Sequence, residues 1–223
     1  MELKEAQTII ERIRQEISQV LVGKPQVLDQ LLTALIASGH VLLEDVPGTG
    51  KTLLSKTLAK SLNCDFTRIQ FTPDLLPSDL SGIHFFNQKT SEFEFRAGPL
   101  FTNILLGDEI NRATPRTQSS LLECMEERQV TIDGETMRLN EPFMVIATQN
   151  PIESQGTFPL PEAQLDRFLM KISMGYPTAE ESMTILKRFQ LSNPIEETQA
   201  VADATQIQQI QQYCRHVKVS EDL

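Results

Sequence analysis

Cysteine and histidine are scarce in this 223-residue sequence, and neither residue type is spaced as a ligand set. The three cysteines lie far apart, at Cys64, Cys124 and Cys214. This odd, unpaired set indicates neither a disulfide framework nor a zinc knuckle, and it favours a reducing compartment. The histidines are also scattered, so we expect boundary or surface residues rather than metal ligands at His40, His84 and His216.

Long apolar runs and basic runs are missing as well. No stretch approaches membrane-spanning length, and the N-terminus opens with Glu2, Lys4 and Glu5 instead of a secretion signal. We therefore expect a cytoplasmic protein with no membrane span. The net charge is −10 and no segment concentrates lysine and arginine, so a nucleic-acid partner is disfavoured.

What the sequence does have is a glycine loop between a strand and a helix. Residues 45–52 read DVPGTGKT, after the apolar run 41–43 and before a segment with helical apolar spacing. Glycines let consecutive backbone N–H groups converge on a phosphate, and the helix N-terminus adds partial positive charge. Lys51 can reach the β- and γ-phosphates of a nucleotide, and the Thr52 hydroxyl can bind Mg²⁺.

The same loop departs from the full phosphate-loop pattern at one position. That pattern begins with glycine, and this chain has Asp45 there. A plain surface turn is the simpler alternative, and the strand–loop–helix context favours the phosphate loop over it. We expect nucleotide contacts from Pro47, Gly48, Thr49, Gly50, Lys51, Thr52 and Leu53.

Two further strand ends carry polar residues suited to phosphate chemistry. The apolar run 104–106 is followed by Gly107, Asp108 and Glu109. Asp108 can hold Mg²⁺ through its waters, and Glu109 can orient and deprotonate the attacking water. The strand 143–148 leads to Asn150, whose amide could hold that water or a γ-phosphate oxygen. Taken alone, the acidic pair could be an ordinary turn, and Asn150 a turn residue before proline.

The order of the segments predicts an α/β fold. Strands at 41–43, 66–71, 104–106 and 143–148 alternate with helices, which predicts a parallel sheet with helices on both faces. Helices are expected over 3–20, from Pro25 to an end at Gly39, and from Pro115 with Thr114 as N-cap. Hairpins are expected at 83–95 and at 129–139, where Val130 and Ile132 would face Met137 and Leu139 across an Asp133-Gly134 turn. From residue 177 the composition becomes polar and helical.

Four segments together resemble the MoxR family of AAA+ ATPases. They are EDVPGTGKT (44–52), GDEINRA (107–113), ATQNP (147–151) and LPEAQLDRF (160–168), and the resemblance covers about residues 5 to 190. It implies a P-loop AAA+ core over residues 1–176 and the start of a helical lid over 177–223. It also implies an ATP- and Mg²⁺-dependent hydrolase.

The resemblance further implies how such a protein works. Members form rings, usually hexameric, with nucleotide bound between neighbours and with hairpins at the places of residues 83–95 and 129–139 facing a central pore. The family acts as a chaperone-like remodelling ATPase in complex maturation or metal-cofactor insertion. It is often paired with a protein that contains a von Willebrand factor A domain, while the client of this chain stays unknown.

The family's site residues transfer onto this sequence unevenly. Lys51, Thr52, Asp108, Glu109 and Asn150 match motif positions directly. The resemblance places Arg167 in the neighbouring subunit's site, where it would stabilise the transferred phosphoryl group; Arg112 and Arg116 are rivals for that role. The alternative for Arg167 is a pair with a carboxylate such as Asp166 or Glu162. Val22 and Gly23 resemble the adenine-side segment, although a glycine separating two helices fits almost as well.

The chain departs from the family after residue 190. Members continue into a complete lid with a second sensor arginine, and Arg188 and Arg215 do not lie in the expected motif. A fragment or a reduced lid is therefore expected, with slow hydrolysis, and a nucleotide-binding scaffold with little turnover is the alternative function. A GTPase is disfavoured because no Asn-Lys-x-Asp occurs, and a small-molecule kinase because no acceptor site is recognisable.

Overall fold

A parallel five-stranded sheet forms the centre of the computed structural model, which describes residues 1–44, 46, 48–151, 155–191 and 193–217. The strand order is β2-β5-β8-β1-β9, and every neighbouring pair is parallel. The strands are β2 (Phe66–Gln70), β5 (Ile104–Asp108), β8 (Met144–Gln149), β1 (Val41–Glu44) and β9 (Met170–Ile172). The predicted α/β fold is confirmed.

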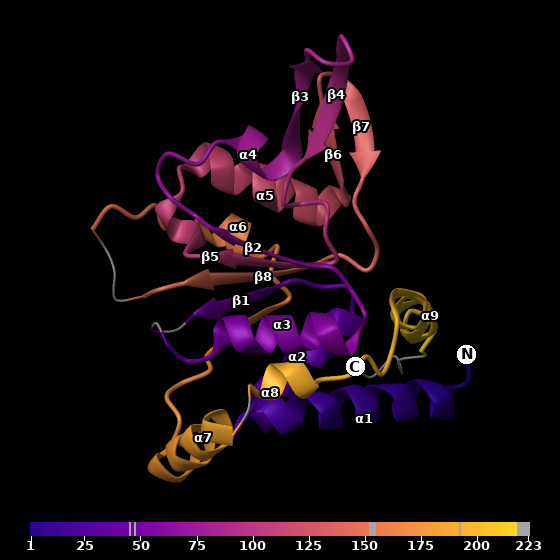
Figure 1. Ribbon diagram of the computed structural model, residues 1–223, viewed down its shortest axis with the longest axis vertical. Helices are drawn as coiled ribbons and strands as arrows, with labels where there is room; N and C mark the ends of the chain where they lie inside the picture. The colour runs from indigo at the N-terminus through magenta and orange to yellow at the C-terminus, as the bar shows by residue number, and fades with distance from the viewer. Residues whose placement is uncertain (45, 47, 152–154, 192, 218–223) are drawn as a thin grey trace.

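Helices cover both faces of this sheet (Figure 1). One face carries α1 (Leu3–Val20), α2 (Pro25–Ile36) and α3 (Lys51–Ser61), and the other carries α4 (Pro77–Ser81) and α5 (Pro115–Glu127). The side chains of β1 alternate between the two cores: Val41 and Leu43 join the α1–α3 side, and Leu42 joins the α5 side. Because both faces of the central strands are covered, their sequences are nearly continuous apolar runs.

The first two helices follow the predicted pattern except at one end. Helix α1 buries Ile9, Ile13 and Ile17, and α2 begins at Pro25 as expected. The predicted end of α2 at Gly39 is wrong by three residues, because the helix stops at Ile36 and Ser38 takes the left-handed conformation. Gly39 meets a different need, since a Cβ there would lie 2.7 Å from the Cβ of Leu169.

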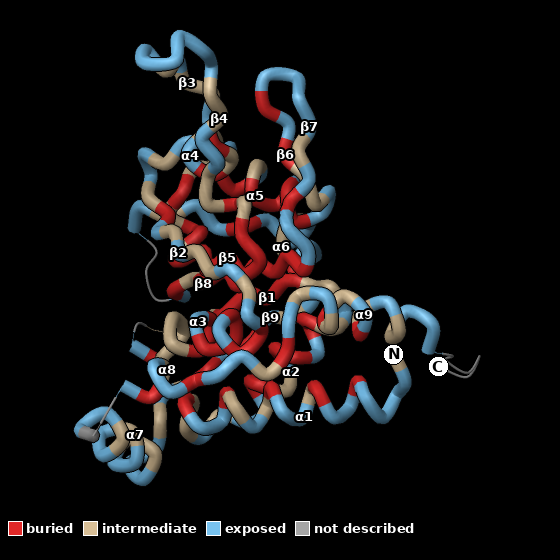
Figure 2. Tube along the Cα trace, turned by 45° about the vertical axis from the view of Figure 1, so that its right-hand side comes forward, coloured by how far each residue is buried: buried red, intermediate tan, exposed pale blue. Residues whose placement is uncertain are grey.

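Two hairpins stand side by side beyond the α4 and α5 layer (Figures 1 and 2). They consist of β3 (Gly82–Asn87) with β4 (Glu92–Ala97), and of β6 (Gln129–Ile132) with β7 (Glu135–Arg138). The two are joined by His84 Nδ1 and Asp133 Oδ2, 2.9 Å apart.

The second hairpin has the predicted turn with a different register at its base. Asp133 and Gly134 have φ of 51° and 87°, as a two-residue primed turn requires. Val130 faces Met137, but Ile132 faces Glu135 and Leu139 follows the last paired residue, so the expected facing of the two apolar sets holds only for Val130 and Met137. The short turn fixes the register, and the Leu139 amide instead donates to the carbonyl of Arg128.

The C-terminal helices differ in how they are held. Helix α9 (Ala204–Cys214) packs on α2, buries Ile207 and Ile210, and receives support from the Gln211 amide, which donates to the Leu35 carbonyl at 2.7 Å. Helix α7 (Ala179–Leu191) lies apart from the sheet, and none of its described side chains is buried (Figure 2). Two further helices are short: α6 (Glu162–Leu165) precedes α7 in the sequence, and α8 (Pro194–Glu197) lies between α7 and α9. The division at residues 176 and 177 stays a prediction.

Helix α7 is expected to be the least stable helix of the chain. Leu186 and Phe189 are 60% and 46% exposed, so α7 gains little from apolar burial, whereas α9 is anchored by two buried isoleucines. Hydrogen exchange followed by mass spectrometry should show α7 amides exchanging well before those of α9 and α1. Equal protection of α7 and α9 would contradict this expectation.

His40 links three elements at the amino-terminal edge of the sheet. Its Nδ1 accepts from the Val145 amide at 2.9 Å, and its Nε2 lies 3.0 Å from the Met125 carbonyl. His40 is therefore a buried boundary residue, and the expectation of a surface position does not hold for it. Burial, aided by the nearby positive charge of Arg128, lowers the pKa of His40 to about 3.

This depressed pKa predicts a pH-dependent loss of stability. The unfolded chain takes up a proton at position 40 as the pH falls below about 6.5, while the folded chain does not until about pH 3. The free energy of unfolding therefore decreases on acidification below pH 6.5, and the decrease reaches about 2 kcal/mol at pH 5. In urea unfolding, the difference in free energy of unfolding between the wild type and His40→Asn should decrease by that amount from pH 7.5 to pH 5. An unchanged difference would refute the expectation.

Among the described residues, no helix combines the length and the apolar character needed to cross a membrane.

Candidate nucleotide site

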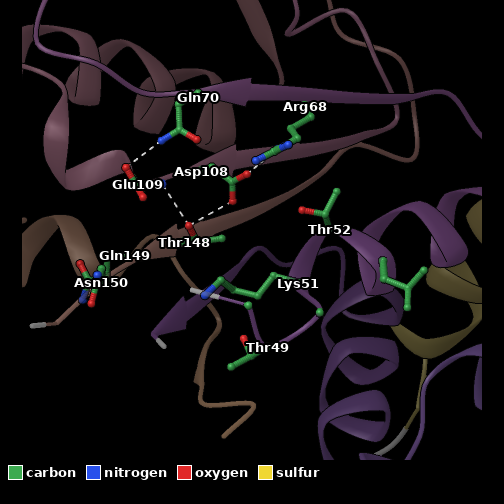
Figure 3. Close-up of a pocket in the computed structure, with 13 residues that line it drawn as sticks. Thr49, Lys51, Thr52, Arg68, Gln70, Asp108, Glu109, Thr148, Gln149 and Asn150 are labelled. Carbon is green, nitrogen blue, oxygen red and sulfur yellow. Dashed lines mark hydrogen bonds and ion pairs between the residues drawn. The ribbon is translucent and has the colours of Figure 1, made fainter. Parts of the chain in front are cut away.

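A cleft of about 430 Å³ opens at the carboxyl ends of β1, β5 and β8, beside the N-terminus of α3 (Figure 3). Parallel strands bring their carboxyl ends to one edge, which is the usual place for ligands in such sheets. The described residues that line it are Gly48, Thr49, Gly50, Lys51, Thr52, Leu53, Arg68, Gln70, Asp108, Glu109, Thr148, Gln149 and Asn150.

The glycine loop leads directly into helix α3. Gly48 and Gly50 have φ of 85° and 92°, in the left-handed region that favours glycine, and α3 begins at Lys51. The first N–H groups of a helix make no hydrogen bond within the helix and carry partial positive charge, so the start of α3 suits an anion. The Lys51 ammonium donates to the Val46 carbonyl at 2.8 Å. Pro47, expected among the nucleotide contacts, and Asp45 lie outside the described residues.

Asp108 is buried at the end of β5 and is only 7% exposed. Its Oδ2 accepts from Arg68 Nε at 2.6 Å, and its Oδ1 accepts from the Thr148 hydroxyl at 3.3 Å. These contacts fix the carboxylate at the cleft wall, opposite the side of the cleft where Thr52 stands (Figure 3).

Glu109 follows in a left-handed conformation with φ of 57°. Its backbone amide donates to the Thr148 hydroxyl at 3.0 Å. Its Oε2 accepts from Gln70 Nε2 at 2.8 Å and pairs with Arg112 Nε at 3.0 Å. The carboxylate thus lines the cleft but is engaged by two side chains of its own chain.

The end of β8 forms another wall of the cleft. Asn150 is buried and lines the cleft. Next to it, Gln149 Nε2 donates to Glu44 Oε1 at 2.6 Å, and Lys171 Nζ lies 2.6 Å from Glu44 Oε2. Burial alone would raise the pKa of Glu44, but the hydrogen bonds from Lys171 and Gln149 lower it below its ordinary value. The charged Glu44 therefore fixes the orientation of the Gln149 amide.

Three predicted site residues do not line this cleft. Arg167 pairs with Glu126 on α5, a partner that differs from the Asp166 or Glu162 named as alternatives. Val22 and Gly23 lie between α1 and α2, where a Cβ at Gly23 would lie 1.9 Å from Oε1 of Glu181 on α7.

Four lining residues were missed in the sequence: Arg68, Gln70, Thr148 and Gln149. The signal for two of them was present, because Arg68 and Gln70 alternate along β2 and so share one face. Their approach to the acidic pair depends on β2 pairing with β5, where Gln70 lies opposite Asp108. That pairing is not readable from either strand alone.

The donors in the cleft suit a hard divalent cation that keeps other ligands. Thr52 and Asp108 offer oxygen donors, and the described residues contain no cluster of three His, Cys, Asp or Glu side chains able to hold a metal ion. Mg²⁺ commonly takes one or two protein oxygens and completes its shell with water and substrate phosphate. Magnesium held jointly with a nucleotide therefore fits these residues.

Comparison with known proteins agrees with this geometry. Residues 40–170 match the family described as "ATPase family associated with various cellular activities (AAA)". The chain is 53% identical over 209 residues to YeaC of Bacillus subtilis, covering 94% of this chain and 65% of that protein. It is 49% identical over 185 residues to Chaperone MoxR1 of Mycobacterium tuberculosis, covering 83% of this chain and 49% of that protein.

A solved structure is similar over nearly the whole chain. The crystal structure of a protein from Cytophaga hutchinsonii, assigned as an ATPase, superposes with a TM-score of 0.86 at 45% identity. The match covers 99% of this chain and 69% of that one. This chain spans about half to two thirds of the length of the two curated relatives. The match over residues 40–170, the identity to MoxR1 and the shared fold show that the chain belongs to the MoxR group of the AAA family of ATPases.

Proposed function

We propose that the cleft binds ATP with Mg²⁺ and hydrolyses the γ-phosphate, and that the chain works as a chaperone-like remodelling ATPase in a ring. The observation that carries this proposal is the meeting of the Gly48–Thr52 loop, the Asp108–Glu109 pair and Asn150 in one cleft. A phosphate cradle, a metal carboxylate and a candidate base are the parts that phosphoryl transfer to water requires.

Each side chain has a distinct part in this scheme. The N–H groups at the start of α3 and the Lys51 ammonium bind the phosphates, for which Lys51 exchanges its contact with the Val46 carbonyl. Thr52 and Asp108 hold Mg²⁺, which when bound neutralises phosphate charge. Glu109 orients the attacking water and accepts its proton.

Asn150 completes this arrangement at the end of β8. Its buried position at the cleft wall suits an amide that fixes either the attacking water or a γ-phosphate oxygen. The neighbouring Gln149 is held by Glu44, so the strand end presents its amides in a defined orientation.

In a ring, a neighbouring copy of the chain would complete the site. Among the residues lining the cleft, Lys51 and Arg68 carry positive charge and Arg167 is absent. Arg167 is partly exposed where it pairs with Glu126, so it can face a second subunit. An arginine supplied in trans stabilises charge on the transferred phosphoryl group, and assembly then controls hydrolysis.

The chaperone role rests on the relatives and on the projecting hairpins. MoxR1 is named a chaperone, and the β3–β4 and β6–β7 hairpins stand clear of the sheet where they could meet a client (Figure 1). A protein with a von Willebrand factor A domain is the proposed partner. A cytoplasmic location and a lid that begins at residue 177 belong to the same proposal, as does an adenine-side role for Val22 and Gly23.

One observation favours a second function, a nucleotide-binding scaffold with little turnover. The Glu109 carboxylate is held by Gln70 and Arg112, and a carboxylate kept in those contacts cannot serve as a base. Measuring phosphate release beside nucleotide binding separates the two functions, because a scaffold binds ATP without releasing phosphate.

The proposed site is tested by Lys51→Ala. Loss of a charged donor to the phosphates should weaken ATP binding about 100-fold, and phosphate release should fall with it. The matched control is Lys56→Ala, which removes an exposed lysine from the same helix outside the cleft. Binding by fluorescent ATP and release of inorganic phosphate give the two readouts. Unchanged ATP affinity in Lys51→Ala would refute the site.

A further inference from the structure

Arg68 is a cleft residue that the proposed mechanism does not use. It lies on β2, and its Nε donates to Asp108 Oδ2 at 2.6 Å (Figure 3). The Arg68 side chain is 51% exposed and that of Asp108 is 9% exposed. A buried carboxylate is thus neutralised by a guanidinium that reaches it from the open side.

The contacts of Asp108 leave little room for a metal ion. Oδ2 is occupied by Arg68 and Oδ1 accepts from the Thr148 hydroxyl. The hydroxyl contact is long, at 3.3 Å, whereas the charged contact is short, at 2.6 Å, as charge-assisted bonds are. A cation that is to bind Asp108 must therefore compete chiefly with the guanidinium.

The contact between Arg68 and Asp108 also changes the charge that an incoming nucleotide meets. Among the described residues that line the cleft, two are cations, Lys51 and Arg68, and two are carboxylates, Asp108 and Glu109. Without Arg68, a triphosphate that arrives without metal would face an uncompensated buried carboxylate, and like charges in a partly buried site repel strongly. Arg68 therefore offsets the charge of Asp108 in the absence of metal.

Structural support alone is a weak explanation for the pair. Strands β2 and β5 are already held together by their backbone ladder from Phe66 to Gln70, and the Phe71 amide donates to the Asp108 carbonyl at 2.8 Å. Because half of the Arg68 side chain faces solvent, its guanidinium can leave Asp108 without opening the core.

We propose that Arg68 is an exchangeable counter-ion of Asp108, which competes with Mg²⁺ and so sets the metal concentration at which the metal–nucleotide complex forms. This inference rests on the proposed function, because it takes Asp108 to be the metal carboxylate. Nucleotide enters a cleft in which Arg68 offsets the charge of Asp108, and the guanidinium moves off Asp108 when the cation arrives.

The test is nucleotide binding with and without metal in Arg68→Gln. Fluorescent ATP is first titrated in EDTA, and Mg²⁺ is then titrated at fixed nucleotide. In Arg68→Gln, ATP without metal should bind about three- to tenfold more weakly. Mg²⁺, by contrast, should bind more readily, with half-saturation at a concentration about three- to tenfold lower. Arg68→Lys, which keeps the charge but not the planar guanidinium, should lie between Arg68→Gln and the wild type.

Other outcomes overturn the inference. Weaker ATP binding both with and without Mg²⁺ would make Arg68 a phosphate ligand, and unchanged values in both titrations would make it a structural residue.

A second variant separates this inference from the proposed function. Asp108→Asn should lose most of the Mg²⁺ dependence of ATP binding, and adding Arg68→Gln to it should change nothing further, because the two residues act through one contact. If Asp108→Asn keeps the full Mg²⁺ dependence, the proposed metal site fails. If it loses that dependence while Arg68→Gln alone leaves the half-saturation concentration unchanged, only the competition fails.

Discussion

Replacing Glu109 with glutamine is expected to leave ATP bound and to lower turnover by about 10²- to 10⁴-fold, the usual contribution of general base catalysis. Glutamine is nearly isosteric and can keep the contact with Gln70, but it cannot accept a proton from water. Asp108 and Lys51 are untouched, so the phosphates and Mg²⁺ keep their ligands. Steady-state phosphate release and equilibrium ATP binding should be measured on the same preparation.

The matched control for this variant is Glu127→Gln, which neutralises an exposed carboxylate on α5 away from the cleft. It should leave both measurements unchanged. An equal loss of ATP binding in Glu109→Gln and Lys51→Ala would remove the proposed division between a base and a phosphate ligand. Full turnover in Glu109→Gln would assign the base elsewhere.

Arg167→Ala is expected to lower kcat by about 10³-fold or more, because an arginine that meets the transferred phosphoryl group in trans contributes an effect of that order. Arg167 does not line the cleft of its own chain, so its action requires a neighbour. An equal mixture of Arg167→Ala and Glu109→Gln chains should therefore regain activity. Random assembly pairs an intact Glu109 with an intact Arg167 at about a quarter of the interfaces.

The ion pair with Glu126 supplies the control for Arg167. If Arg167 acted only by holding α5 through that pair, Glu126→Gln would lower kcat as much as Arg167→Ala does. Under the trans proposal Glu126→Gln keeps most of the activity. Absence of recovery in mixtures that demonstrably co-assemble would favour a role within one chain, and Arg112→Ala and Arg116→Ala would then be tested for the trans role.

The sequence was most informative where one short segment determines its own structure. The loop from Gly48 to Thr52 needs only its glycines and the following helix, and the Asp133-Gly134 turn needs only its two residues. Strand ends were also predictable, because Asp108 and Asn150 each follow an apolar run whose carboxyl end reaches the same edge of the sheet.

Contacts between distant segments could not be predicted in the same way. Arg68 meets Asp108 across 40 residues of sequence, and His40 meets Val145 across 105 residues. Each contact depends on the order in which strands pair, and that order depends on packing of the whole sheet. The pair of Arg167 with Glu126 is similar, since local carboxylates at Asp166 and Glu162 were the nearer candidates in sequence.

The central claim is that the cleft beside α3 binds ATP and Mg²⁺ together. The most direct measurement is a crystal structure of the Glu109→Gln chain grown with ATP and Mg²⁺, because this variant should retain nucleotide without consuming it. We predict the phosphates at the N-terminus of α3 near Lys51, with the metal between the Thr52 hydroxyl and the Asp108 carboxylate and with Arg68 displaced from that carboxylate. Nucleotide bound elsewhere, or a cleft left empty at saturating ATP, would contradict the account.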